Sequence, residues 1–205
     1  DDNPGGDADF VFGFESDLEG WTNIDADGDG HLWYHSSESE TYHAVLPSEP
    51  HTGAGYVGSE SYCNYYGPLY PDNYFVAPAK YAVENGAKIK FYACTKDDGY
   101  PAEHFGVAVS TAGNTSVSDF TTIQEWVITN RTTWTKYTVD LSAYAGQEIY
   151  VAIRHFFPNN EWENSGNGLD LDALDIDDII FENVLVNTAH SSTYSYDDPY
   201  YFNVT

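Results

Sequence analysis

Apolar and polar residues alternate along this chain with a period of two, and that pattern constrains the fold more than any other feature. Helical periodicity is almost absent, whereas the alternation recurs in five stretches: Lys88–Ala93, His104–Ser110, Thr135–Leu141, Glu148–Arg154 and Asp175–Phe181. Successive side chains of a strand point to opposite faces, so each stretch predicts a strand with one buried face. Clusters of Gly, Pro, Asn and Ser separate the stretches at the spacing typical of sandwiches. We expect an all-β fold, an antiparallel β-sandwich of the jelly-roll type, with a closed barrel as the alternative.

The length of 205 residues fits one domain. We expect a linker over residues 1–9, the domain over 10–186, and a tail over 187–205 that forms an extra strand or a second linker. The segment Gly30–Tyr70 has few strand-like stretches and predicts a long loop region, which in a compact domain is usually functional or held by a metal. Cys63 and Cys94 could form one disulfide, but two cysteines are too few for a disulfide scaffold or a cysteine-based zinc site.

The charge of the chain limits its partners. Asp and Glu number 33 against 7 Lys and Arg, which gives a formal net charge of −26. This excess predicts no binding to nucleic acid and argues against an anionic membrane surface. No run of apolar residues is long enough to cross a bilayer, so we expect no membrane insertion. Such a charge opposes compaction unless cations neutralise part of it, which is a first indication of divalent metal.

The segment Asp25–Gly30 resembles the head of a calcium-binding loop. Asp25, Asp27 and Asp29 occupy alternate positions of a glycine-rich turn, an arrangement that points carboxylate oxygens at one centre. An EF-hand would place Glu where this chain has Ser36, and the flanking residues are strand-like, so the loop is not an EF-hand. The remaining ligands must therefore come from elsewhere in the fold.

A second concentration of carboxylates lies within the last expected strand. In a regular strand Asp178 would share a face with Ile176 and Ile180, and Asp177 would share the other face with Ile179. At least one carboxylate is then expected on the core-facing side. An unpaired buried carboxylate is costly, and a hard cation that takes several oxygen ligands resolves the cost. A merely solvated acidic turn is the alternative at both places.

The sequence gives little support for a zinc site or for catalysis. His31 and His35 have the spacing of a zinc pair, but the segment is not helical and lacks the accompanying Glu. Glu161 and Glu163 lie in one loop, whereas glycosidase acid pairs come from facing elements. No nucleophile with a base and an orienting group can be assembled from the sequence. We therefore expect a protein that is not an enzyme.

The aromatic residues divide into expected core and candidate ligand surface. The strand-like stretches predict three core tryptophans: Trp21, Trp33 and Trp134. Trp162 lies in a polar loop, where an exposed ring could stack on a sugar. A second candidate surface is formed by four tyrosines: Tyr62, Tyr65, Tyr66 and Tyr70. Packing within the loops is the alternative for both groups.

Several motifs, taken in order, resemble the cleaved adhesin domain family, the haemagglutinin and adhesin modules found beside gingipain proteases. They lie within residues 10–182 and are Phe14-Glu15-Ser16, Trp21 to Gly30, Ser59-Glu60-Ser61, Pro71 to Pro78, Glu103-His104-Phe105, Ile153 to Phe156 and Ile176 to Ile179. The chain is also similar, more loosely, to MAM domains of receptor ectodomains. The insertion from Phe157 to Asp172 departs from the family pattern.

The resemblance implies a jelly roll with one or two structural calcium ions. It implies as ligands the side chains of Glu15, Asp25, Asp27, Asp29, Asp177 and Asp178, the backbone of Gly13, His31, Gly53 and Gly55, and Asn73 through its side chain or carbonyl. Glu15 and the Asp177–Asp178 pair lie near opposite ends of the chain. A shared ion would therefore hold the first and last strands together.

These features predict a non-catalytic adhesion module, secreted or at the cell surface and part of a larger multidomain protein. Its expected partners are host or matrix proteins, or glycans. The alternative is a carbohydrate-binding module of a secreted hydrolase, with Trp162, Tyr65 and Tyr66 as ligand-binding residues.

Overall fold

The computed structural model describes residues 10–38, 49–63, 65–95, 102–128, 133–157 and 173–186. Strands account for most of these residues, and the only helical elements among them are 3-10 turns. The strands are β1 (Phe10–Phe12), β2 (Thr22–Asp25), β3 (Tyr34–His35), β4 (Val57–Glu60), β5 (Tyr62–Cys63), β6 (Gly67–Pro68), β7 (Asp72–Val76), β8 (Tyr81–Thr95), β9 (Glu103–Ser110), β10 (Thr121–Ile128), β11 (Thr135–Asp140), β12 (Glu148–Phe156) and β13 (Ala173–Val186). The 3-10 turns are η1 (Ser36–Glu38), η2 (Val117–Asp119) and η3 (Ser142–Tyr144).

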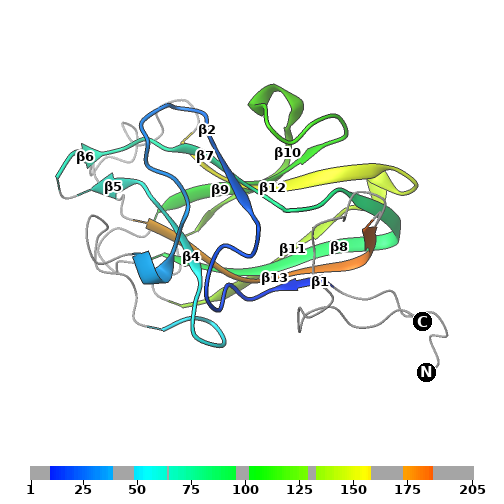
Figure 1. The fold of residues 1–205 in the computed structure, drawn as a ribbon, viewed down its shortest axis with the longest axis horizontal. Helices are drawn as coiled ribbons and strands as arrows, with labels where there is room; N and C mark the ends of the chain where they lie inside the picture. Colours follow the sequence, from blue (N-terminus) through cyan, green and yellow to red (C-terminus); the bar gives the residue numbers. More distant parts are fainter. Residues whose placement is uncertain are drawn as a thin grey trace.

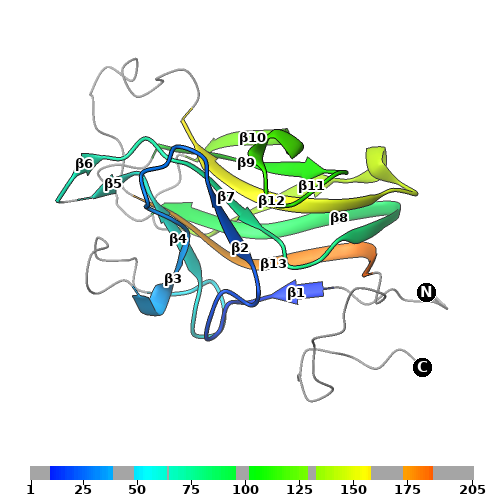
Figure 2. The same ribbon diagram turned by 45° about the horizontal axis from the view of Figure 1, so that its top comes forward.

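The larger strands form two antiparallel layers that pack face to face (Figures 1 and 2). One layer, the β8 sheet, has the order β11–β8–β13–β4–β3, with β1 also paired to β13. The other layer, the β9 sheet, has the order β10–β9–β12–β7–β2, and it is continuous with the first where Glu148 and Ile149 of β12 pair with β8. Within the described chain β10 pairs only with β9 and β11 only with β8, so this side of the structure is not closed. The expected antiparallel sandwich is confirmed, and the closed barrel is not what forms.

All five expected strands are present, because each has an apolar face that the opposite layer covers. In β8, Ala87, Ile89 and Phe91 are fully buried, whereas the intervening Lys88 and Lys90 retain exposed surface. The same alternation places one face of β9, β11 and β12 between the layers. The period of two in the sequence therefore translates directly into this fold.

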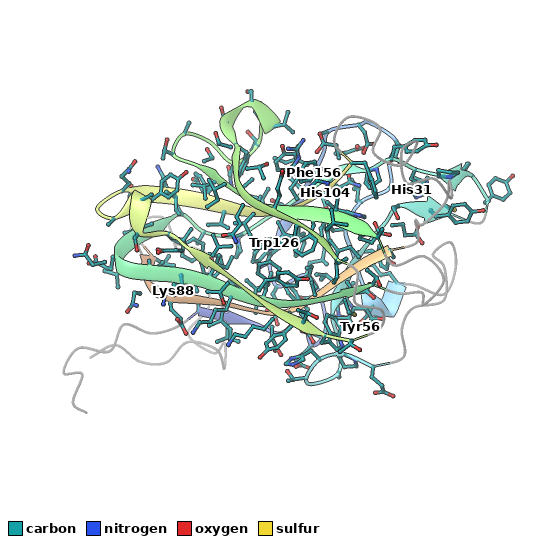
Figure 3. The ribbon with its side chains drawn as sticks, turned by 180° about the vertical axis from the view of Figure 1, so that it is seen from behind. His31, Tyr56, Lys88, His104, Trp126 and Phe156 are labelled. Atoms are coloured by element: carbon teal, nitrogen blue, oxygen red, sulfur yellow. The ribbon has the colours of Figure 1, made fainter. Side chains whose placement is uncertain are left out.

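Large aromatic rings fill the interior. Trp21 stacks on Phe75 with ring centroids 4.8 Å apart, and Trp33 stacks on the same ring at 5.5 Å. Trp126 packs against Phe105 at 5.4 Å, between the two layers near their open side (Figure 3). These contacts confirm Trp21 and Trp33 as core residues.

The expectation for Trp134 is wrong. Its ring is half-buried and packs edge-on against Tyr56 and His51, and its indole N–H donates to the Glu49 carbonyl oxygen at 3.2 Å. It therefore covers the segment that begins at Glu49 instead of entering the core. The reason is that Trp134 precedes β11 and so escapes the alternation of that strand.

Two further expectations concern membranes and disulfides. In the described chain, none of the helical turns has the length or the apolar character needed to cross a bilayer. Cys63 and Cys94 are both buried, and no disulfide bond joins them. Burial raises the pKa of the Cys94 thiol, and the neighbouring Asp175 carboxylate adds to that effect.

Candidate functional site

The acidic loop after β2 folds on its own backbone. Asp25 accepts hydrogen bonds from Gly28 N at 2.7 Å and Gly30 N at 3.0 Å, and Asp29 accepts from His31 N at 2.7 Å. This wrapping turns the side chains inward, so that one oxygen from each of Asp25, Asp27 and Asp29 lies within 4.8 Å of the other two. The structure thus brings together the three carboxylates that the sequence pattern groups.

Asn73 lies directly opposite Asp25 in the β2–β7 pairing, with both side chains on the same face of the sheet. It is 1% exposed, and its side-chain oxygen and nitrogen have no hydrogen-bond partner in the described part of the chain. Its carbonyl oxygen accepts a hydrogen bond from the Trp33 indole at 3.2 Å. Of the two groups that the resemblance implies, the side-chain oxygen therefore has no hydrogen bond, whereas the carbonyl oxygen accepts one.

Electrostatics at the loop favours a cation. Burial raises the pKa of Asp27, and the hydrogen bonds from the backbone N–H groups of Asp72 and Asp29 only partly oppose that rise. The neighbouring charges of Asp29 and Asp25 raise it further. A divalent ion among these oxygens would remove the repulsion that now disfavours the ionised form.

A second carboxylate cluster surrounds Glu15. Its Oε2 accepts a hydrogen bond from Ala54 N at 2.6 Å. A Cβ at Gly53 would lie 1.7 Å from Glu15 Oε1, and one at Gly13 would lie 3.3 Å from the same oxygen and 3.9 Å from Asp178 Oδ1. Both glycines therefore line a narrow space that the carboxylates of Glu15 and Asp178 enter, and any larger residue at position 53 would fill it.

Asp177 and Asp178 complete this cluster through the segment that includes His51 and Thr52. Asp177 Oδ2 accepts from the backbone N–H groups of both residues, at 2.9 Å and 3.2 Å. Asp178 accepts from Thr52 Oγ1 at 2.9 Å and pairs with His51 Nδ1 at 2.5 Å. The His51 ring in turn stacks on Tyr92, with centroids 3.5 Å apart. The first strand region, the 49–56 segment and the last strand thus meet at one point.

The prediction that one of these two carboxylates faces the core is wrong. A β-bulge interrupts the β13–β8 pairing between Asp177 and Ile180, and Asp178 has a φ of 49°. Asp177 is paired with Tyr92, whose ring faces away from the core, and Asp177 is buried beneath His51 and Thr52. The extra residue in the bulge lets Ile176 and Ile179 both reach the core while the acidic pair stays outside it.

Glu19 belongs to the same region, and sequence reasoning missed it. Burial raises its pKa to about 7, despite hydrogen bonds from the N–H groups of Glu15 and Phe14. Burial likewise raises the pKa of Asp177 to about 7, with a further contribution from the Asp178 charge. Nothing in the local pattern distinguishes Glu19 from an ordinary turn residue.

Gly55 has a steric role, because a Cβ there would lie 2.0 Å from the Phe14 carbonyl oxygen.

A polar network crosses the interior at one end of the sandwich. His155 Nδ1 lies 2.9 Å from Ser59 Oγ, and its Nε2 lies 2.8 Å from Glu103 Oε2. Ser61 Oγ donates to Glu103 Oε1 at 2.6 Å. The sequence offered no nucleophile, base and orienting group, yet the fold aligns Ser, His and Glu here. All four side chains are 0% exposed, so the arrangement ties β4 of one layer to β9 and β12 of the other.

The other sequence candidates fall in different places. His35 uses both ring nitrogens, on the Phe14 carbonyl oxygen and on Ser37 Oγ, so it does not combine with His31 in a metal pair. Tyr65 and Tyr66 lie at the β5–β6 turn and are 84% and 67% exposed. Trp162, together with Glu161 and Glu163, lies outside the described residues.

These features define a jelly-roll module with two clusters of carboxylates, and comparison with known proteins places it in a family. The model of the Cleaved Adhesin Domain matches residues 12–176, and the chain therefore belongs to that family. It is 35% identical over 157 residues to haemagglutinin A of Porphyromonas gingivalis. That match covers 67% of this chain but only 7% of the haemagglutinin, so the relative is a far longer protein.

Two solved structures are similar to this chain in fold. A cleaved adhesin domain of Lys-gingipain from Porphyromonas gingivalis is 34% identical, with a TM-score of 0.64, and the alignment covers 86% of this chain and 98% of that domain. A tandem CBM22 domain, built of carbohydrate-binding modules, from Paenibacillus barcinonensis has a TM-score of 0.50 at 12% identity, covering 93% of this chain and 48% of that one. The second likeness shows the fold alone.

Proposed function

We propose that this chain is a non-catalytic adhesion module whose fold is stabilised by calcium. Family membership supports the adhesion role, since the relatives include haemagglutinin A. The observation that carries the calcium part is the narrow space around Glu15, where Gly13, Gly53 and Asp178 from three distant segments converge. The Asp25–Asp29 loop, with the unpartnered amide of Asn73, offers a second site.

Calcium suits both places because each supplies several oxygen ligands and little nitrogen or sulfur. The donors at the loop are the carboxylates of Asp25, Asp27 and Asp29 with the Asn73 side chain and the His31 carbonyl. The donors at the other site are Glu15 and Asp178, aided by Asp177 and the backbone of Gly13 and Gly53. When bound, the ions would offset the mutual repulsion of these carboxylates and join segments far apart in the sequence.

Calcium removal tests this part of the proposal. With free calcium at 100 times its Kd, the folded state should gain about 2.7 kcal/mol, so EDTA should lower the melting midpoint by about 5–10 °C. Asp27→Asn and Asp178→Asn should each weaken calcium binding in isothermal titration calorimetry. Glu148→Gln removes the same charge at an exposed position and should leave calcium binding unchanged. An unchanged midpoint in EDTA, without heat of calcium binding, would overturn the proposal.

We infer that the module works at the cell surface or after secretion, as one part of a longer protein. The matched relatives are many times longer than this chain, which supports the multidomain context. Its partners are proposed to be host or matrix proteins, or glycans. The absence of a catalytic role is supported by the burial of Ser59, His155 and Glu103, which keeps their reactive atoms inside the sandwich.

Adhesion is tested by displaying the module on beads, because a single weak site requires multivalency to crosslink cells. Beads that carry the wild-type module should agglutinate erythrocytes in calcium and lose that activity in EDTA. A carbohydrate-binding module, the alternative function, would instead have its agglutination blocked by a free oligosaccharide and would bind no matrix protein. Beads that never agglutinate cells and bind no matrix protein would contradict both.

A further inference from the structure

The β5–β6 turn carries an exposed aromatic surface that the calcium sites do not use. We call it the tyrosine tip and define it by Tyr65, Tyr66 and His31, whose rings contact one another in series. Tyr65 is 84% exposed and Tyr66 is 67% exposed. Exposed aromatic rings gathered at one place are unusual on a soluble protein and are typical of a contact surface.

The tip is held in place by the residues below it. Tyr66 N donates to the Cys63 carbonyl oxygen at 3.1 Å and closes the turn, while Cys63 itself is 3% exposed and anchors the hairpin. The rings of Tyr65 and Tyr66 pack edge-to-face at 4.9 Å, and Tyr66 packs edge-on against His31 at 5.5 Å. The two tyrosines are therefore positioned by each other and by His31, which lowers the entropy lost when a partner binds.

The surroundings of the tip are acidic. His31 N is bonded to Asp29, so the tip adjoins the loop that holds Asp25, Asp27 and Asp29. No Lys or Arg occurs before Lys80, so none comes from the segments that build the tip and the loop. Arg154 adjoins the loop through Asp72, whose N–H donates to Asp27, but its charge is already paired with the Asp72 carboxylate. The carboxylates of the loop also outnumber the charge of one divalent ion, so the field stays negative when the loop is loaded.

The tip also lies at the end of the molecule away from the C-terminal end of the last strand. In Figures 1 and 2 the β5–β6 hairpin is at one end of the long axis and the end of β13 at the other. A module that continues into neighbouring domains beyond β13 would present the tip outward.

We propose that the tyrosine tip docks a cationic segment of a partner protein, with Lys or Arg side chains over the tyrosine faces and their charges toward the acidic loop. This rests on the proposed adhesion function and names its partner class. Exposed tyrosine faces attract cations, and the negative field steers them. A second copy of this chain is excluded as occupant by its net charge of −26, and a neutral glycan would gain nothing from that field.

The test uses a fluorescent peptide of Arg-Gly-Ser repeats and the same peptide with citrulline in place of Arg, at physiological ionic strength. The whole chain should bind the Arg peptide and not the citrulline peptide in fluorescence anisotropy. The double variant Tyr65→Ala with Tyr66→Ala should raise the Kd for the Arg peptide by about fivefold to thirtyfold, because two exposed cation–π contacts are lost. Tyr65→Phe with Tyr66→Phe should keep the affinity, because the rings remain.

Val127→Ala is the matched control, since Val127 is 52% exposed and lies on β10. None of these variants changes the net charge. If the double alanine variant binds the Arg peptide as tightly as the wild type does, binding depends only on the overall negative charge, and the proposal is overturned. Binding of neutral oligosaccharides that depends on Tyr65 and Tyr66 would overturn it in favour of a glycan. If wild-type beads agglutinate cells and the double variant does so equally, the tip fails while the adhesion function stands.

Discussion

Single residues without side chains decide whether the Glu15 site can exist. Gly53 has a φ of 63°, a conformation that side chains rarely adopt, and it also borders the Glu15 carboxylate. Two separate reasons thus require glycine at this position. Gly146 has a similar φ of 79° but nothing within 4 Å of its would-be Cβ, so only the conformational reason applies there.

This pair of glycines separates the two effects. Gly146→Ala should cost about 1–2 kcal/mol of unfolding free energy, the same in calcium and in EDTA. Gly53→Ala should lower the free energy of unfolding by more in calcium than in EDTA, because the added methyl group displaces Glu15 from the proposed site. Thermal unfolding of both variants in both buffers measures this. Equal losses for Gly53→Ala in the two buffers would show that Glu15 does not bind the ion.

At the scale of the strands, the two layers are joined by polar contacts as well as by apolar packing. The His155–Glu103 pair is fully buried, and loss of Glu103 would leave the Nε2 atom of His155 without its hydrogen-bond partner inside the sandwich. The chain contains a useful comparison in His104 and Glu125, whose nitrogen and oxygen are 3.7 Å apart, because Glu125 is 55% exposed.

Removing the glutamate from each pair should lower the free energy of unfolding by different amounts. Glu103→Ala should destabilise the protein by about 3–5 kcal/mol, since the Nε2 of His155 and the hydroxyl of Ser61 both lose their buried partner. Glu125→Ala should cost about 1 kcal/mol or less, as exposed pairs do. Urea unfolding of the two variants gives both values. Similar costs would mean that the buried pair contributes little to joining the layers.

At the scale of the whole molecule, acidity couples stability to pH and, under the proposed function, to calcium. Without a cation, burial raises the pKa of Asp177 and of Glu19 to about 7, whereas both carboxyls have pKa values of about 4 when unfolded. Between those limits the folded state binds more protons than the unfolded state, so stability falls as pH rises. The growing negative charge of the chain acts in the same direction.

We therefore expect the melting midpoint in EDTA to decrease as pH rises from about 4.5 to 7.5. Saturating calcium should flatten or reverse this slope, because the ion binds the ionised carboxylates and holds them charged. Scanning calorimetry across this range, with and without calcium, makes the comparison. A midpoint that rises with pH in EDTA would contradict the assignment of raised pKa values to these carboxyls.

The candidate sites were only partly predictable. Asp25, Asp27 and Asp29 are close in sequence, so their pattern was sufficient to group them. The bulge at Asp178 was not visible, because it depends on the segment around His51 covering Asp177 from outside. Glu19 gave no signal for the same reason, since its burial depends on surroundings that the local pattern does not reveal.

The order of apolar and polar residues alone was enough to specify an antiparallel all-β fold, because a period of two gives each strand one apolar face to bury. Whether the strands form a sandwich or a closed barrel was decided by the tertiary structure, in which β10 and β11 do not pair. The same order also specified an acidic chain that favours cations. Which carboxylates meet, and that Ser59, His155 and Glu103 align in the interior, was decided only by the pairing of distant strands. Register and bulges set those contacts, and they depend on how the whole sandwich closes rather than on any one segment.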